Sequence, residues 1–490
     1  MRSWSVLGFF TLLLINQSWA FKPHDFKTCS QSGFCRRGRA LSARAKEAKT
    51  PWVSPYSVDQ SSIEISTNQA VFTAAVKSSL YPNIKFGLEV RIHEDGVARV
   101  RMDEVGGLRK RYDEAASWSL IAEPSISQDI KWIQGKKDIR AVYGEDKDIE
   151  VVVAYAPLRV SLLRNGKEQV VLNGQGLLHM EHFRTKEGPK VEGDSADNEA
   201  QVAIEARKSN AWFEGETEDA LWEETFSTWT DSKPKGKIKF LIVVFSLFTT
   251  YVVGPESLSL DINFPNHGTV YGIPQHATNL ALPSTTGSDP TYTDPYRLYN
   301  CDVFEYLAWS PVSIYGSVPL MHAHSTDSTV AVFHVVASET WIDVSHSSDK
   351  STETHWISES GILDIFLLPG PTAEAVFTQY ARLTGKQSIP PFWSLGYHQS
   401  RWNYISSDDV RTVQKRFDEE DIPVDVFWLD IDYAEDRRYF MWKSTFPDPV
   451  EMTNDVAAFG RKVWLHSTFS IDVYRVNPFL NRWLLLSTHI

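Results

Sequence analysis

Hydrophobic and polar residues alternate in short stretches through most of the chain, a pattern typical of half-buried β-strands. Leu88–Ile92 and Val97–Met102 alternate on either side of Glu94-Asp95-Gly96, which predicts a hairpin. A second hairpin is predicted at the Asn165-Gly166 turn. Because strands of this kind continue to about Leu368, we expect a β-sandwich domain over residues 62–390.

A helical pattern follows the strands. The apolar residues of Ala373–Leu383 predict a helix that ends near Gly385. Pro390-Pro391 then marks a domain boundary. Beyond it we expect a strand at Phe392–Tyr397 and a helix opened by the capping sequence Ser406–Asp409.

The next apolar segment, Val424–Leu429, is a near-continuous run typical of a parallel strand covered on both faces. A third strand is expected around Val463–Leu465. These segments predict the first two or three βα units of an incomplete (β/α)8 TIM barrel over residues 391–463. A barrel fragment leaves strand edges uncovered, which is an aggregation hazard.

Two carboxylates follow the Val424–Leu429 strand. Asp430 and Asp432 are two residues apart, so in a continued strand they would point the same way. The carboxyl end of a barrel strand is where α/β barrels place their chemistry. The pattern indicates a candidate site, and its alternative is a pair of solvated loop acids.

The N-terminus has the features of a secretory signal peptide. Arg2 provides the positive charge, Val6–Ile15 is largely apolar, and Ser18-Trp19-Ala20 fits the small-x-small cleavage pattern. A membrane anchor is the alternative, but the apolar run is shorter than the roughly 20 residues that a span needs. We therefore expect residues 1–20 to be removed in the secretory pathway, and no membrane span.

Residues 21–61 form a segment that contains two of the three cysteines. Cys29 and Cys35 lie six residues apart, and an oxidising lumen favours a small disulfide loop between them. Zinc is the alternative, although no second ligand pair is near. Cys301 is expected to be a buried thiol. The basic residues from Arg36 to Lys49 are interpreted as a solvated linker.

Charge and composition narrow the classes of function. The 490 residues are 42% hydrophobic, which is ample for sizeable cores, and the formal net charge of −13 argues against nucleic acid as a partner. The sequence has no His-x-x-x-His ligand pair and no Gly-rich phosphate loop. We therefore expect no cofactor and no metal.

Several motifs occur together in one order: Leu221–Phe226, Tyr271–Ala277, Pro295–Phe304, Gly396–Tyr404 and Val424–Tyr433. Together they closely resemble glycoside hydrolase family 31, the retaining α-glucosidases. Within that family the resemblance is strongest to the catalytic α subunits of endoplasmic-reticulum glucosidase II. It runs from about Phe26 to about Lys462.

The resemblance implies a fold, a reaction and a compartment. It implies that residues 62–390 are a galactose-mutarotase-like sandwich. The implied function is release of terminal α-linked glucose from N-glycans or other α-glucosides in the endoplasmic-reticulum lumen, with a separate β subunit as partner of the full-length enzyme. It also implies that Asp430 binds the sugar being cleaved, with Asp302, Phe304 and Asp432 as weaker candidates. Gln275 replaces an acid that is common in the Tyr271–Ala277 motif.

The family's catalytic pair is not found in this sequence. The nucleophile of the family lies in a Trp-Asn-Asp-Met-Asn-Glu-Pro type motif, which does not occur here. Catalytic residues are therefore expected to be absent, and the chain as written is expected to be inactive.

Two segments do not resemble the family, an apolar insertion at residues 237–253 and a tail at 464–490. We interpret both as foreign to the fold, such as translated intron. The competing interpretations of the chain are a non-catalytic carbohydrate-binding decoy, and a protein tethered to a membrane through Phe240–Val253.

Overall fold

The computed structural model describes residues 26–66, 70–107, 109–128, 130–182, 256–301, 306–438 and 441–465, and the backbone of 184–186 and 251–253. The expected signal peptide, the tail from His466 onward and most of the 237–253 insertion lie outside the described residues. The chain divides into two compact units, Met1–Lys386 and Gln387–Ile490. In the described part of the chain, no helix is both long enough and apolar enough to cross a bilayer.

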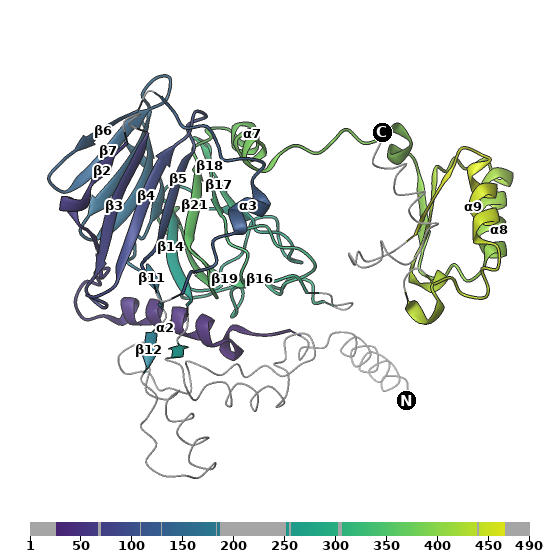
Figure 1. The fold of residues 1–490 in the computed structure, drawn as a ribbon, viewed down its shortest axis with the longest axis horizontal. Coiled ribbons are helices and arrows are strands. Elements are labelled where there is room, and N and C mark those ends of the chain that lie inside the picture. Colours follow the sequence, from purple (N-terminus) through teal and green to yellow (C-terminus); the bar gives the residue numbers. More distant parts are fainter. Residues whose placement is uncertain are drawn as a thin grey trace, which may run out of the picture. The chain divides into compact units, whose positions relative to one another are not determined.

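The first unit is built on two large antiparallel sheets (Figure 1). The first sheet has the order β1-β3-β4-β5-β21-β18-β17-β15, with β2 beside β3. Its strands are β1 (Tyr56–Val58), β2 (Glu64–Ile65), β3 (Val71–Ser78), β4 (Lys85–Ile92), β5 (Ala98–Val105), β15 (Val270–Gly272), β17 (Leu320–His324), β18 (Thr329–His334) and β21 (Leu363–Leu368).

The second sheet has the order β16-β19-β20-β14-β10-β9-β8-β7-β6, with β11 beside β14. Its strands are β6 (Lys131–Gln134), β7 (Asp138–Tyr143), β8 (Ile149–Tyr155), β9 (Leu158–Arg164), β10 (Lys167–Leu172), β11 (His179–Met180), β14 (Leu258–Phe264), β16 (Tyr296–Leu298), β19 (Thr340–His346) and β20 (Thr352–Ser358). A separate pair joins β12 (Arg184–Lys186) to β13 (Tyr251–Val253), so the last residues of the insertion lie in a short strand.

Alternating burial explains how the two sheets form the sandwich. In β4 every second side chain, from Phe86 to Ile92, is buried in the main core, and the residues between them are partly exposed. The predicted hairpins are confirmed, since β4 pairs with β5 and β9 with β10. Asn165 and Gly166 both have positive φ, at 50° and 73°, as a tight two-residue hairpin turn requires.

Helix α2 (Gly33–Glu47) corrects the expectation of a solvated basic linker. It follows the short 3-10 helix η2 (Cys29–Gln31) and packs on the sandwich, and a second 3-10 helix, η3 (Gln60–Ser62), comes after β1. Arg37 is 3% exposed and donates two hydrogen bonds to the Glu181 carboxylate, at 2.8 and 3.2 Å. Arg37 is ordered because an acid that is distant in the sequence neutralises it.

Two further helices are found in the described part of the first unit. These are α3 (Ala115–Ser119) and α7 (Ala373–Thr384), which covers β18 and β21. The predicted helix at 373–383 is confirmed. Thr372 caps it by accepting a hydrogen bond from the Ala375 amide, and Gly385 ends it with a φ of 93°.

The second unit is a three-stranded parallel sheet with helices on one face (Figure 1). The strands are β22 (His398–Arg401), β23 (Val426–Leu429) and β24 (Lys462–Leu465), and the helices are α8 (Ser407–Glu419) and α9 (Pro449–Ala457). The 3-10 helix η4 (Phe392–Leu395) precedes β22, and η5 (Ile431–Tyr433) and η6 (Glu435–Arg437) lie between β23 and α9. The described sheet is an open fragment of a barrel, as predicted.

The first predicted strand of this unit was placed too early. Phe392–Leu395 is η4, and β22 begins at His398. After Pro391 the chain turns tightly, because the Ser394 amide and hydroxyl both donate to the Pro391 carbonyl. Gly396 then passes close to the next strand, where an added Cβ would lie 1.8 Å from Asp425 Oδ2.

Candidate functional site

The carboxyl ends of the three parallel strands meet at one edge of the second unit. Arg401 ends β22, Leu429 ends β23 and Leu465 ends β24, and these three residues are in register. Asp430 follows β23 directly. Because neighbouring parallel strands bring their carboxyl ends together, this edge is where the predicted site residue lies.

The two faces of this sheet have different environments. On one face Phe427, Leu429, Val463 and Leu465 pack with Val410 of α8 and with Met452 and Val456 of α9. Strand residues alternate between faces, so His398, Trp428 and Trp464 lie on the other. The rings of Trp428 and Trp464 are 5.3 Å apart, and Trp464 is 52% exposed. Among the described residues, the face of the sheet opposite α8 and α9 is therefore aromatic and partly open.

Asp430 is half-buried at the start of η5. Its Oδ1 accepts a hydrogen bond from the Ile431 amide at 2.7 Å, which holds the carboxylate at the strand exit. Within the described residues, no basic side chain forms an ion pair with Asp430. Its second carboxylate oxygen is thus available to a neutral polar ligand such as a hydroxyl.

Asp432 is not placed as the alternation argument predicted. The strand ends at Leu429, and Asp432 lies inside η5, where successive side chains follow a helical spacing. Its carbonyl oxygen accepts a hydrogen bond from Lys443 Nζ at 3.4 Å. The prediction that the Asp430 and Asp432 side chains point the same way assumed an extended chain, and the chain is not extended at Asp432.

Arg401 is engaged by α8 at the same edge. Its guanidinium forms an ion pair with Asp409 at 2.6 Å and lies 4.4 Å from the centre of the Tyr404 ring. The hydrogen bond to Asp409 raises the pKa of Arg401 above its ordinary value, so the side chain stays charged. Trp402, the next residue, is 62% exposed.

A hydrogen bond that sequence reasoning missed links two of the strands. Trp428 Nε1 donates to His398 Nδ1 at 2.9 Å, and His398 Nε2 lies 3.0 Å from the Ser394 carbonyl oxygen. The sequence gives no spacing signal for this contact, because the two residues belong to different strands. This hydrogen bond fixes the indole ring of Trp428, which lies two residues before Asp430 in the sequence.

The other predicted site residues lie in the first unit. Asp302 and Phe304 fall outside the described residues. The Gln275 amide donates to the Gly316 carbonyl at 3.0 Å, so the Tyr271–Ala277 motif is hydrogen-bonded to the loop at Gly316. Cys29 and Cys35 form a disulfide, and Cys301 is buried and lies outside it.

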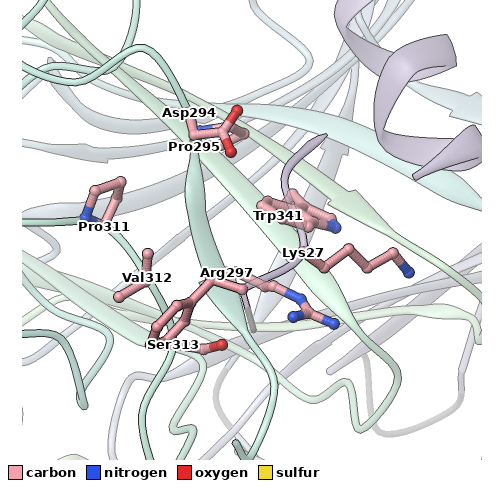
Figure 2. A pocket seen from close by; sticks show the side chains of 9 residues that line it. Lys27, Asp294, Pro295, Arg297, Pro311, Val312, Ser313 and Trp341 are labelled. Carbon is pink, nitrogen blue, oxygen red and sulfur yellow. The ribbon is translucent and has the colours of Figure 1, made fainter. Parts of the chain in front are cut away.

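The first unit also has a small pocket beside the residues that precede α2 (Figure 2). Its charged side chains are paired internally, since Glu339 contacts both Lys27 Nζ at 3.3 Å and Arg297 Nε at 3.1 Å. Asp294 accepts a hydrogen bond from the Cys29 amide at 3.3 Å. We assign no ligand to this pocket. The described residues also contain no cluster of three or more acidic, histidine or cysteine side chains that could hold a metal.

Family models match both units. Residues 87–343 match the glycosyl hydrolase 31 N-terminal galactose mutarotase-like domain, and residues 387–481 match the glycosyl hydrolases family 31 TIM-barrel domain. The chain belongs to glycoside hydrolase family 31. The second match extends past Lys462, near which the motif resemblance ends.

Relatives of this family 31 chain are glucosidases. It is 36% identical over 460 residues to glucosidase 2 subunit alpha of Schizosaccharomyces pombe, covering 90% of this chain and 45% of the relative. It is 34% identical to human neutral alpha-glucosidase AB, covering 94% and 48%. A crystal structure of a glucosidase II alpha subunit bound to DNJ matches with a TM-score of 0.75 at 33% identity, covering 96% of this chain and 49% of that one. The chain thus spans about half the length of the relatives it matches.

Proposed function

We propose that this chain is part of an α-glucosidase of the glucosidase II α-subunit type, which releases terminal α-linked glucose during N-glycan processing. Family membership and the names of its relatives support this function. The single observation that carries the proposal is the position of Asp430, a half-buried carboxylate at the carboxyl end of a parallel barrel strand.

Asp430 is proposed to bind the sugar rather than to attack it. A carboxylate can accept hydrogen bonds from two neighbouring hydroxyl groups of a glucose ring. Retaining hydrolysis also requires a nucleophile and an acid/base whose carboxyl groups lie about 5–5.5 Å apart. In this family the nucleophile lies in a separate motif, which is not found in this sequence and to which Asp430 does not belong. Asp430 is therefore assigned a role in binding alone.

The chain as written is therefore expected to bind α-glucosides without cleaving them. An aryl α-glucoside incubated with it near neutral pH should be hydrolysed no faster than the uncatalysed background, because general acid and nucleophilic catalysis are both missing. Turnover that persists through repurification would contradict this. A non-catalytic carbohydrate-binding protein is the second candidate function, and the missing nucleophile motif is the observation that favours it.

Replacing Asp430 by asparagine tests the binding role. The amide keeps the shape but loses the charge and one acceptor, which costs about 1.5–3 kcal/mol for a charged hydrogen bond. The affinity for DNJ should fall about 10- to 200-fold, measured by isothermal titration, with the thermal midpoint unchanged. Asp421→Asn, an exposed position at the other end of the sheet, is the control. An affinity within a factor of two of the parent would make Asp430 a solvated acid.

The compartment and the partner complete the proposal. We infer that the chain enters the endoplasmic-reticulum lumen through residues 1–20 and that its full-length form pairs with a β subunit. A crystal structure of a relative contains the catalytic subunit with the binding domain of the regulatory subunit. Co-expression of tagged chains, followed by purification through the β subunit, would test the pairing. Recovery equal to that of an unrelated secreted protein would contradict it.

A further inference from the structure

A chain of hydrogen bonds starts at η4 and ends on β23. Ser394 turns back onto Pro391, and the Ser394 carbonyl oxygen lies 3.0 Å from His398 Nε2. His398 Nδ1 in turn lies 2.9 Å from Trp428 Nε1. The imidazole therefore bridges a backbone carbonyl and an indole that are far apart in the sequence.

The partners of this imidazole assign its hydrogen. A carbonyl oxygen can only accept, so His398 Nε2 must carry the N–H group. An indole Nε1 can only donate, so His398 Nδ1 must be the acceptor. The ring is thus held as one neutral tautomer with both nitrogens used, which leaves it a single orientation.

The indole that His398 holds is not part of the helix-covered core. Trp428 is half-buried, and its neighbour across the strand pair is the 52% exposed Trp464. An indole N–H that is removed from water normally finds a partner, and here the partner is the side chain of His398, the first residue of β22, instead of solvent. Trp428 precedes Asp430 by two residues, so both project from the same face of the extended chain.

We propose that His398 is a positioning residue for sugar binding. It holds the Trp428 indole so that the ring forms an apolar floor on the face of the sheet from which Asp430 projects. A glucosyl ring has hydroxyl groups at its rim and C–H groups on its faces. Asp430 would take hydroxyls while the Trp428 ring lies against the C–H face, as amphipathic aromatic rings do. The inference rests on the proposed function, because it requires that Asp430 binds glucose.

Three variants of the full chain test the role. His398→Leu removes the acceptor and keeps the volume. His398→Asn keeps an acceptor near the place of Nδ1. His346→Leu is the control, since His346 also has a partner at each ring nitrogen but lies at an exposed position in the first unit. The ligand is DNJ, and the second readout is the indole N–H resonance of Trp428 in tryptophan-labelled protein, assigned with Trp428→Phe.

His398→Leu should weaken DNJ binding about tenfold and shift the Trp428 resonance. His398→Asn should recover most of the affinity, and His346→Leu should change neither readout. If His398→Leu does not fold, His398→Phe provides the same test, because it keeps an aromatic ring and deletes the acceptor; it should weaken binding to a similar extent.

The outcomes separate the two proposals. If the parent binds DNJ, Asp430→Asn weakens binding and His398→Leu does not, the positioning role is wrong and the proposed function stands. Equal losses for His398→Leu and His398→Asn would also overturn the role, because the acceptor would then not matter. If the parent does not bind DNJ, the proposed binding site and the positioning role both fall.

Discussion

At the scale of single residues, His355 shows how burial alters the chemistry of a side chain. It lies in β20 and is 5% exposed, and among the described residues neither ring nitrogen has a hydrogen-bond partner. Burial lowers the pKa of His355 to about 4, with Lys46 and Arg39 of α2 adding to the effect and Asp343 opposing it. The side chain is therefore neutral at pH 7.

The stability of the sandwich should fall as the pH drops from about 6.5 to 4. In that range the unfolded chain, whose histidines have ordinary pKa values near 6.5, binds a proton that folded His355 does not. The full contribution, about 3 kcal/mol, is present above pH 6.5 and lost near pH 4. Urea unfolding at pH 7 and pH 4.5 should show a smaller difference for His355→Phe than for the parent. The exposed His346→Phe variant should show the same difference as the parent. If the free energy of unfolding changes equally between the two pH values in all three proteins, the argument is refuted.

At the scale of elements, α2 depends on contacts with strands that come much later in the sequence. Gly38 lies against Ile357 of β20, where an added Cβ would meet three side-chain carbons at 2.7 to 2.8 Å. Arg39 forms an ion pair with Asp343 at 2.6 Å. At Gly38 the helix therefore approaches the second sheet so closely that a side chain has no room.

Gly38→Ala should therefore destabilise the protein, although alanine is intrinsically the better helix former by about 1 kcal/mol. The close approach to Ile357 should outweigh that gain and give a net loss of about 1–3 kcal/mol. Lys46→Ala, on the exposed side of the same helix, should change the free energy of unfolding by less than about 0.5 kcal/mol. Chemical denaturation of both variants measures the difference, and a stabilised Gly38→Ala would show that α2 does not pack as described.

The sequence predicted local elements better than distant contacts. The Asn165-Gly166 hairpin and the Ser406 cap of α8 are set by neighbouring residues, and both are present in the structure. The ordered α2 could not be predicted, because Arg37 pairs with Glu181, 144 residues away. In the site, the strand before Asp430 was predicted from its apolar run. The His398–Trp428 bond was not, because strand register decides it.

At the scale of the whole molecule, the two units have separate hydrophobic cores. The core of the second unit draws its buried residues from Tyr404 to Val456, and the main sandwich core draws its buried residues from Tyr56 to Leu367. A change confined to one core should therefore act on that unit alone. The disulfide between Cys29 and Cys35 packs with Trp341 and Ile357 and belongs to the first unit.

Replacing both Cys29 and Cys35 by alanine should lower the stability of the first unit alone. Opening a loop of this length restores chain entropy to the unfolded state, which costs about 2 kcal/mol. Differential scanning calorimetry should show one transition moved to lower temperature and a second, from the parallel-sheet unit, unchanged. Cys301→Ala is the control, because it leaves the disulfide in place. A single transition that moves as a whole would contradict the independence of the cores.

The docking of α2 also sets an order of events during synthesis. Arg39 is made 304 residues before its partner Asp343. At roughly 5–20 residues per second, translation separates the two by roughly 15 to 60 seconds. Cys29 and Cys35 are only six residues apart and can pair throughout that interval. The nascent chain therefore has time to close its disulfide ring before the surface that will cover it has been made.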